Sequence, residues 1–132
     1  MKEYLPYVIA CVAAAASFLL NRVFLQRFGM QTIITLSPVA EEMLKTLTAY
    51  SVDADILITH VVFGLIEAVY DWLQTRGRLM AAFFSVGGHS LFGFVTVLTT
   101  QAAGINIGLA AGIVAHLLWN TIMVKLLPGK AK

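Results

Sequence analysis

Hydrophobic residues run through most of the chain in blocks that are long enough to cross a membrane. A helix that spans a bilayer needs about 20 largely apolar residues. Four blocks meet this requirement, at residues 4–25, 55–75, 79–101 and 105–126. They predict an all-α protein, a polytopic bundle of transmembrane helices that forms a single integral membrane domain over residues 1–132.

A fifth block, residues 31–52, has the right length but contains Glu41, Glu42 and Lys45. Charge placement favours a crossing here too. If about five helices cross and the N-terminus lies outside, nearly all basic residues fall at cytoplasmic ends, as is usual in membrane proteins. These residues are Arg22, Arg27, Arg76, Arg78, Lys125, Lys130 and Lys132. We therefore expect an outside N-terminus and a cytoplasmic C-terminus.

The start of the fifth block allows two interpretations. Ser37-Pro38 is typical of an N-cap residue followed by proline at the first helical position. The helix then begins at Pro38, and residues 31–36 form a short re-entrant or broken piece. Alternatively, one longer helix is kinked at Pro38. In both cases Glu41 and Glu42 lie in the first turns of a helical segment.

Composition excludes several other classes of protein. The 132 residues are 59% hydrophobic and 12% charged, which leaves too little polar material for the surface of a soluble domain. A formal net charge of +2 gives no basis for nucleic-acid binding, and the single cysteine, Cys11, allows no intramolecular disulfide. Residues 8–11 loosely resemble a lipoprotein cleavage site. Apolar residues continue past Cys11, however, so we interpret the first block as a retained signal-anchor helix.

Ionisable side chains inside the predicted spans gather at one depth. Four helices each supply one, about eight to ten residues from the predicted cytoplasmic end at about 1.5 Å per residue. They are Glu42, Glu67, His89 and His116. A charge in the hydrocarbon costs at least a few kcal/mol. Polar packing between helices could explain one such residue, whereas four at one level favour a functional site.

Other polar or small residues fall off this level. His60 lies nearer the outer face, and we interpret it as structural or interfacial. Asp71 lies toward the cytoplasmic end, where it either joins a water-filled entry or pairs with Arg76 or Arg78. A repeat of small residues in the last block allows close helix packing, inside the bundle or at a dimer face. This repeat is Gly104, Gly108 and Gly112.

The residue types in the set suit proton transfer to and from a water molecule. A glutamate in a low-dielectric pocket can act as a general base, and Lys45 would hold one carboxylate charged. Glu41 and Glu42 point about 100° apart on a helix, so they cannot face one water equally and can divide the roles. Asn120 shares a helix face with His116, and both could donate hydrogen bonds to a developing oxyanion.

Other intramembrane protease chemistries lack their motifs. The chain has no H-E-x-x-H zinc motif and no G-x-S-x-G serine elbow. Tyr70-Asp71 matches only the first half of a presenilin-type site, because no second G-x-G-D follows. Glutamate and histidine from three helices could nevertheless hold a metal ion.

The polar motifs, in their order along the chain, resemble those of the PrsW family of glutamic intramembrane proteases. "EEMLK" (41–45) matches its E-E-x-x-K motif, and "FGLIE" (63–67) matches its F-x-x-x-E helix. "GGHSLFGF" (87–94) resembles its central histidine helix, and "HLLWN" (116–120) its last helix. The wider superfamily of CAAX prenyl proteases and Abi/CPBP enzymes shares the double glutamate and the final H-x-x-x-N. In those enzymes the basic residue of the first motif is an arginine one position later than Lys45, and the second motif is F-x-x-x-H where this chain has Glu67. This chain is therefore more similar to PrsW.

The resemblance implies an endopeptidase in a prokaryotic cell membrane, with the bilayer around it and a membrane protein or lipid-anchored peptide as substrate. It implies no metal and no other cofactor, and no nucleic-acid partner. The implied catalytic residues are Glu41, Glu42, His89, His116 and Asn120, supported by Lys45, Glu67 and Phe63.

The resemblance also implies a role for each of these residues. Glu41 polarises the attacking water, and His89 helps to bind that water and moves its proton. His116 and Asn120 stabilise the oxyanion. An orienting ion-pair network is formed by Glu42, Lys45 and Glu67. The choice of base between Glu41 and Glu42 stays open, with Glu41 preferred.

Two other functions also fit the sequence. A small proton-coupled transporter buries a glutamate among aromatic residues, but it does not need histidine and asparagine at oxyanion spacing. A catalytically inactive relative could act as a membrane scaffold that binds a partner helix. A polar set closed to water would favour the scaffold, whereas a cavity that reaches Glu41 from the cytoplasmic side would favour the protease.

Overall fold

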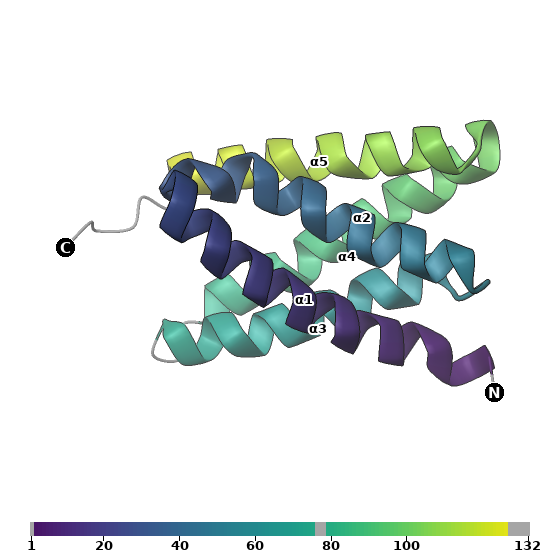
Figure 1. The fold of residues 1–132 in the computed structure, drawn as a ribbon, viewed down its shortest axis with the longest axis horizontal. Helices are drawn as coiled ribbons and strands as arrows, with labels where there is room; N and C mark the ends of the chain where they lie inside the picture. The colour runs from purple at the N-terminus through teal and green to yellow at the C-terminus, as the bar shows by residue number, and fades with distance from the viewer. Residues whose placement is uncertain (1, 76–78, 127–132) are drawn as a thin grey trace.

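The computed structural model describes residues 2–75 and 79–126, which form helices and short turns only. Five α-helices make a bundle in which the start of α1 and the end of α5 lie at opposite ends (Figure 1). They are α1 (Leu5–Phe28), α2 (Leu36–Ser51), α3 (Ile56–Gln74), α4 (Leu79–Ala103) and α5 (Ile105–Leu126). The 3₁₀ helices η1 (Lys2–Tyr4) and η2 (Met30–Ile34) precede α1 and α2. The predicted all-α class is confirmed.

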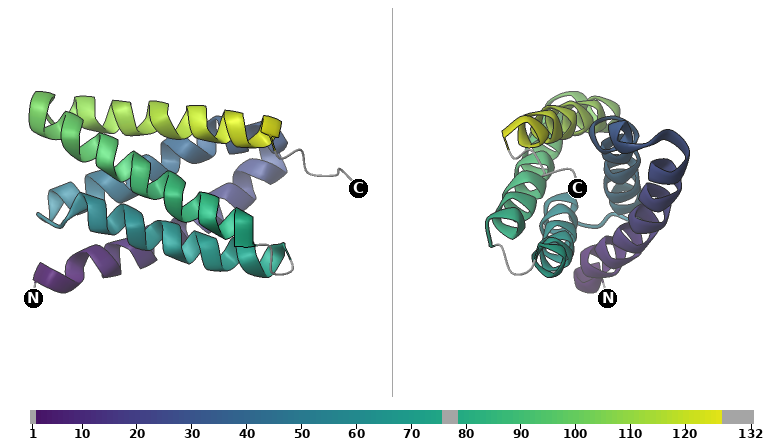
Figure 2. Two further views of the ribbon diagram at one scale, coloured as in Figure 1. Left: turned by 180° about the vertical axis from the view of Figure 1, so that it is seen from behind. Right: turned by 90° about the vertical axis from the view of Figure 1, so that its left-hand side faces the viewer.

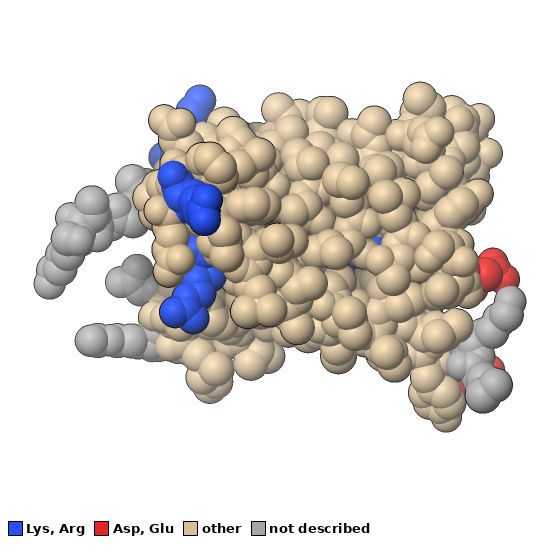
Figure 3. Space-filling model, viewed as in Figure 1, with Lys and Arg blue, Asp and Glu red and all other residues tan. Residues whose placement is uncertain are grey.

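The outer surface of the bundle is apolar along most of its length. Within the described ranges, α1, α3, α4 and α5 are long and apolar enough to cross a membrane. Large hydrophobic side chains such as Leu19, Phe83 and Leu118 point outward, and Figure 3 shows very little charge on the surface between the two ends. A surface of this kind is stable in lipid and not in water. The predicted polytopic membrane bundle is therefore confirmed.

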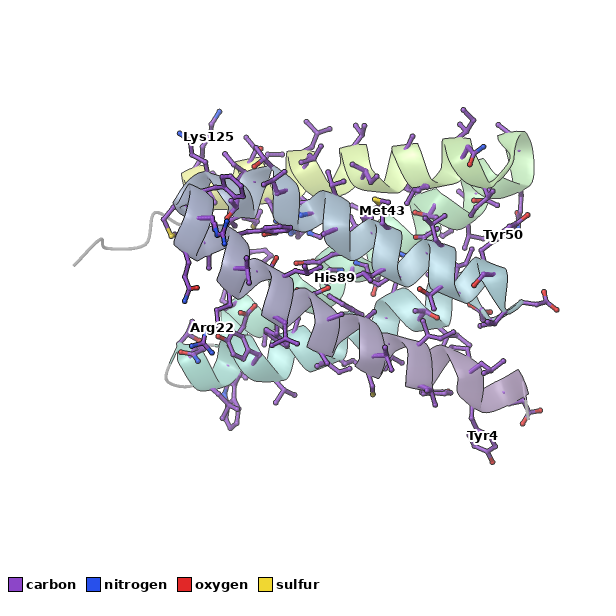
Figure 4. The ribbon with its side chains drawn as sticks, in the orientation of Figure 1. Tyr4, Arg22, Met43, Tyr50, His89 and Lys125 are labelled. Atoms are coloured by element: carbon purple, nitrogen blue, oxygen red, sulfur yellow. The ribbon has the colours of Figure 1, made fainter. Side chains whose placement is uncertain are left out.

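Charged residues lie at the two ends of the bundle. Lys and Arg side chains gather at one end and acidic side chains at the other (Figure 3). We call the first the basic end; among the described residues it carries Arg22 and Lys125 (Figure 4) and also Arg27 in the last turn of α1. At the opposite end Asp55 caps α3, since its Oδ1 accepts a hydrogen bond of 2.8 Å from the backbone N–H of Ile58. Four other residues that we expect at cytoplasmic ends lie outside the described residues: Arg76, Arg78, Lys130 and Lys132.

A short separate piece lies between α1 and α2, as the first of the two interpretations predicts. Gly29 has a φ of 74° and ends α1, and η2 then leads into α2. The alternative of one longer helix kinked at Pro38 is wrong. The N-cap position is also corrected: α2 begins at Leu36 after Thr35, so Ser37 lies inside the first turn. Pro38 fits there because the N–H groups of a first turn have no helical partner.

α2 is an amphipathic helix with its polar face turned inward. It has 16 residues and lies between α1 and α5, as Figure 2 shows from the basic end. Met43, Leu47 and Tyr50 face outward, while Glu42 and Lys45 are completely buried. This is the reverse of a soluble protein. With 16 residues, α2 is also shorter than the four apolar helices, and it is not among the helices that are long and apolar enough to cross a membrane.

Two glycines bring α5 close to α4. A Cβ on Gly108 would meet the side chain of Thr100, and one on Gly112 would meet the hydroxyl of Thr96. Only glycine allows this approach, so these members of the small-residue repeat pack inside the bundle. Gly104 lies in the turn between the two helices with a φ of 88°.

Candidate active site

The polar face of α2 forms the centre of a buried network. Glu41 is 4% exposed, and Glu42 and Lys45 are 0% exposed. Ionised groups buried to this extent are tolerated only when they are paired and hydrogen-bonded. Partners for all three come from four other helices, and the following contacts define the site.

Lys45 links α2 to α4. Its Nζ donates a hydrogen bond of 2.7 Å to Oε1 of Glu42, one turn back on the same helix. The same Nζ bonds to Nδ1 of His89 at 2.8 Å and lies 4.4 Å from the centre of the Phe63 ring. Glu42 and the aromatic face both favour the charged ammonium. Phe63, for which the resemblance implies a supporting role, thus contacts Lys45.

The contact with Lys45 fixes the orientation of the His89 ring. An ammonium can only donate hydrogen bonds, so Nδ1 of His89 accepts and its proton is on Nε2. Nε2 then donates to Oε2 of Glu67 on α3 at 2.6 Å. Figure 4 shows His89 in the interior, midway between the basic end and the opposite end. One histidine therefore joins three helices.

His116 of α5 carries its proton on the other ring nitrogen, Nδ1, whereas His89 carries it on Nε2. Its Nδ1 lies 2.9 Å from Oε1 of Glu42, so Nδ1 carries the proton and donates it to this carboxylate. The lone pair of Nε2 is then directed elsewhere, and Nε2 lies 3.9 Å from Oε2 of Glu41. The ring is stacked on Phe92, with 4.3 Å between centres and 20° between planes. His116 is therefore held with a free acceptor nitrogen near Glu41.

Glu41 is held from the other side by α1. Asn21 donates a hydrogen bond of 2.9 Å from Nδ2 to Oε1 of Glu41. This contact fixes one carboxylate oxygen and leaves Oε2 beside His116. The sequence did not identify Asn21, although a polar residue one position before Arg22 in an apolar block could have drawn attention to it.

A cavity of about 310 Å³ lies next to these groups. At its inner end are Glu41, Glu67, His89 and His116. The other lining residues continue to the last turns of α5, so the cavity extends toward the basic end. Its walls are largely aromatic and apolar, with Phe84, Phe92, Trp119, Leu25, Ile33 and Met123 among them. Glu42 and Lys45 are not among the lining residues; they lie behind Glu41 and His89.

The structure brings the predicted set together, with one difference for Asn120. Its side chain lines the cavity, but Nδ2 donates to the backbone carbonyl of Ile33 at 2.9 Å. Asn120 therefore ties η2 to α5 in this structure. Trp119 also lines the cavity, and its ring lies where a Cβ on Gly88 would be.

His60 lies closer to the set than the sequence indicated, and its interpretation as a structural residue stays a prediction. This residue is fully buried. Its Nε2 lies 3.1 Å from Oγ1 of Thr46 and 3.7 Å from Oε2 of Glu42. Counting residues from helix ends did not reveal this contact, because such a count gives depth along one helix and does not show which side chains of α2 and α3 meet.

Asp71 lines the cavity one turn from Glu67, toward the basic end. Ser85 of α4 donates a hydrogen bond of 2.5 Å from Oγ to Oδ2 of Asp71. Of its two predicted roles, the structure thus agrees with a place in the entry. The predicted pairing with Arg76 or Arg78 falls outside the described residues.

Three of these side chains could hold a metal ion. Glu41, His89 and His116 each offer one ligand atom, and these atoms lie within 4.8 Å of one another. A metal needs a lone pair from each histidine. His116 has one at Nε2, but His89 uses Nδ1 to accept from Lys45 and Nε2 to donate to Glu67. Metal binding would therefore require His89 to lose a proton and its contact with Glu67.

The chain matches no family model, no curated protein and no solved structure.

Proposed function

We propose that this protein is a glutamic intramembrane endopeptidase, similar to PrsW, that hydrolyses a peptide bond of a membrane-associated protein. One observation carries the proposal: Glu41, fixed by Asn21 and next to the free nitrogen of His116, lies at the inner end of a cavity. A cavity that reaches Glu41 is the feature that distinguishes a protease from a scaffold with a closed polar set.

The contacts favour Glu41 over Glu42 as the base. Glu41 lines the cavity, and its Oε2 is available to a water molecule. Glu42 does not line the cavity, and its Oε1 is engaged by Lys45 and His116. A general base must come within hydrogen-bond distance of the proton it removes. Glu42 is a positioning residue that orients His116.

The chemistry begins when Glu41 accepts a proton from a water bound at the inner end of the cavity. The water oxygen bonds to the peptide carbonyl carbon, and the carbonyl oxygen becomes an oxyanion. When the C–N bond breaks, the leaving nitrogen takes up the proton held by Glu41, directly or through Nε2 of His116. The products are a carboxylic acid and an amine, so atoms and charges balance.

The hydrogen bonds favour an exchange of the two histidine roles that the resemblance implies. His89 carries its proton on Nε2, at the cavity, and can donate it to the oxyanion in place of Glu67. His116 presents a lone pair there and suits proton transfer with Glu41. Asn120 becomes a second oxyanion donor when substrate displaces the carbonyl of Ile33.

The proposed orientation in the membrane follows from the charges at the two ends of the bundle. The basic end faces the cytoplasm, in accordance with the positive-inside rule, so the cavity opens to that side and the N-terminus lies outside. The substrate is a membrane protein or lipid-anchored peptide in a prokaryotic cell membrane.

The test is cleavage of generic transmembrane and lipid-linked peptides by the purified protein in proteoliposomes. Wild type is compared with Glu41→Gln and Glu42→Gln, with and without a chelator. Cleavage that persists with chelator and is lost in Glu41→Gln supports the proposal. Full activity of Glu41→Gln in a well-folded protein would contradict it, and loss of wild-type activity with chelator would indicate a metal site.

A further inference from the structure

The cavity contains more carboxyl groups than hydrolysis requires. Glu41, Glu67 and Asp71 all line it, and among the described residues no lysine or arginine does. Lys45 lies behind His89 and is fully buried. Asp71 has no part in the proposed chemistry, because it lies one turn, about 5.4 Å, beyond Glu67 toward the basic end.

Asp71 is held in a fixed position by a second helix. Ser85 of α4 donates to Oδ2 of Asp71 at 2.5 Å. This bond occupies one lone pair of one oxygen, and a carboxylate has about four acceptor positions. The side chain is half-buried at the cavity wall. A fixed carboxylate in partly desolvated surroundings attracts a cation more strongly than one on the surface does.

Aromatic rings line the same cavity. The rings of Phe84 and Trp119 have centres 6.3 Å apart in an edge-on arrangement, and Trp119 continues to Phe92 at 6.1 Å. Aromatic faces attract cationic head groups, and apolar walls bind the alkyl stem of a lysine. This carboxylate and these rings together match a long side chain that is apolar along its length and cationic at its tip.

We propose that the cavity binds a lysine or arginine side chain of the substrate next to the cleaved bond, with its cationic head at Asp71. This inference rests on the proposed protease function. A lysine has a four-carbon stem, which suits the one-turn distance between Glu67 and Asp71. Membrane proteins are also rich in Lys and Arg where their helices reach the cytoplasm, the side to which we assign the opening of this cavity.

The experiment uses sets of three single-span peptides. The peptides of one set differ at a single position in the flank predicted to be cytoplasmic, and each set tests a different position along that flank. The residue there is Lys, its uncharged isostere norleucine, or Glu. Binding is measured with the non-cleaving Glu41→Gln protein in lipid nanodiscs, and cleavage with wild type. Asp71→Asn is made in both backgrounds, and Glu3→Gln at the opposite end is the control that removes the same charge.

We expect the Lys peptide to bind and to be cleaved about tenfold better than the norleucine peptide at one position, since a hydrogen bond to a charged group contributes about that factor. Asp71→Asn should remove this preference, and Glu3→Gln should keep it. Equal binding of the three peptides, or a preference that survives Asp71→Asn, would overturn the inference.

The binding arm separates this inference from the proposed function. Preference for Lys in binding without any cleavage would support the cationic site and count against the protease. Cleavage without any preference for the Lys peptide would support the protease and count against the cationic site. Uptake of the lipophilic cation tetraphenylphosphonium into liposomes, driven by a pH gradient and with no preference for the Lys peptide, would assign the cavity to a cation transporter and overturn the peptide site.

Discussion

Lys45 and His89 are joined by a hydrogen bond of 2.8 Å between Nζ and Nδ1, across the interface of α2 and α4. This bond determines which nitrogen of His89 carries the proton, and therefore what His89 can do at the cavity. It also makes Lys45 the connection between Glu42 on one side and the His89–Glu67 pair on the other. A lysine that does not line the cavity thus controls the groups that do.

Replacing Lys45 with methionine should therefore destabilise the protein strongly. The change leaves the Glu42 carboxylate buried without its cation, and breaking a buried ion pair costs about 3–5 kcal/mol. Stability can be measured as unfolding in mixed micelles of increasing denaturing detergent. The double variant Lys45→Met/Glu42→Gln should lose less than the sum of the two single changes, because it leaves no unpaired charge. Additive losses would contradict the buried pair.

Glu41→Gln should abolish cleavage and leave the fold nearly unchanged. The glutamine side chain keeps an oxygen that can accept from Asn21, while loss of a general base lowers the rate about 10²- to 10⁴-fold. The measurements are initial rates of peptide cleavage and the thermal unfolding temperature of the same preparation. A stability loss equal to that of Lys45→Met would show that the two residues do not differ as the ion-pair network requires.

Chelators should leave the activity unchanged. A metal at Glu41, His89 and His116 would need a lone pair that His89 does not have while it is bonded to Lys45 and Glu67. Activity is measured after dialysis against a strong chelator and again after zinc is added back. Loss on dialysis with recovery on zinc addition would mean that the proton arrangement around His89 is different from the one described.

The sequence was sufficient for most of the fold because its strongest signals are local. Apolar blocks predicted the four long helices, and the fifth block contains the helix α2. That α2 crosses the membrane, as charge placement indicates, stays a prediction. The start of α2 was misplaced by two residues because Ser37-Pro38 has the composition of a helix start, whereas the turn is determined by Gly29 and η2. Such a turn depends on backbone conformation that residue types only partly specify.

The site was harder to predict where it depends on side-chain geometry. Depth and periodicity brought Glu42, Glu67, His89 and His116 to one level, since helical rise is regular. They could not reveal that Asn21 of α1 fixes Glu41, because that contact depends on how α1 crosses the bundle. The proximity of His60 to Glu42 was not predicted for the related reason that depth along a helix does not show which side chains of two helices meet.

His60→Leu should lower stability and leave catalysis intact. Nε2 of His60 pairs with Oγ1 of Thr46, and a buried hydroxyl left without a partner costs about 1–3 kcal/mol. The double variant with Thr46→Val should recover part of the loss, since both polar partners are then replaced. Cleavage per folded molecule should stay close to wild type because His60 does not line the described cavity. A large drop in that rate would place His60 in the catalytic machinery.

Gly112→Ala should reduce both stability and activity, because the added methyl group enters the most crowded part of the site. It would meet the hydroxyl of Thr96 and come within 3.3 Å of Oε2 of Glu42. Overpacking of this kind costs about 1–3 kcal/mol. Gly112 lies one turn from His116, so displacement of α5 should also lengthen the bond between His116 and Glu42.

Two further variants distinguish crowding from other effects of alanine. Adding Thr96→Ala to Gly112→Ala makes room for the methyl group and should restore part of the stability and the cleavage rate. Gly108→Ala is the matched control, since it meets Thr100 one turn farther from His116. It should lower stability while it affects the rate per folded molecule less. If Gly112→Ala and Gly108→Ala reduced that rate equally, the spacing of α5 at Gly112 would not be what positions His116 for proton transfer.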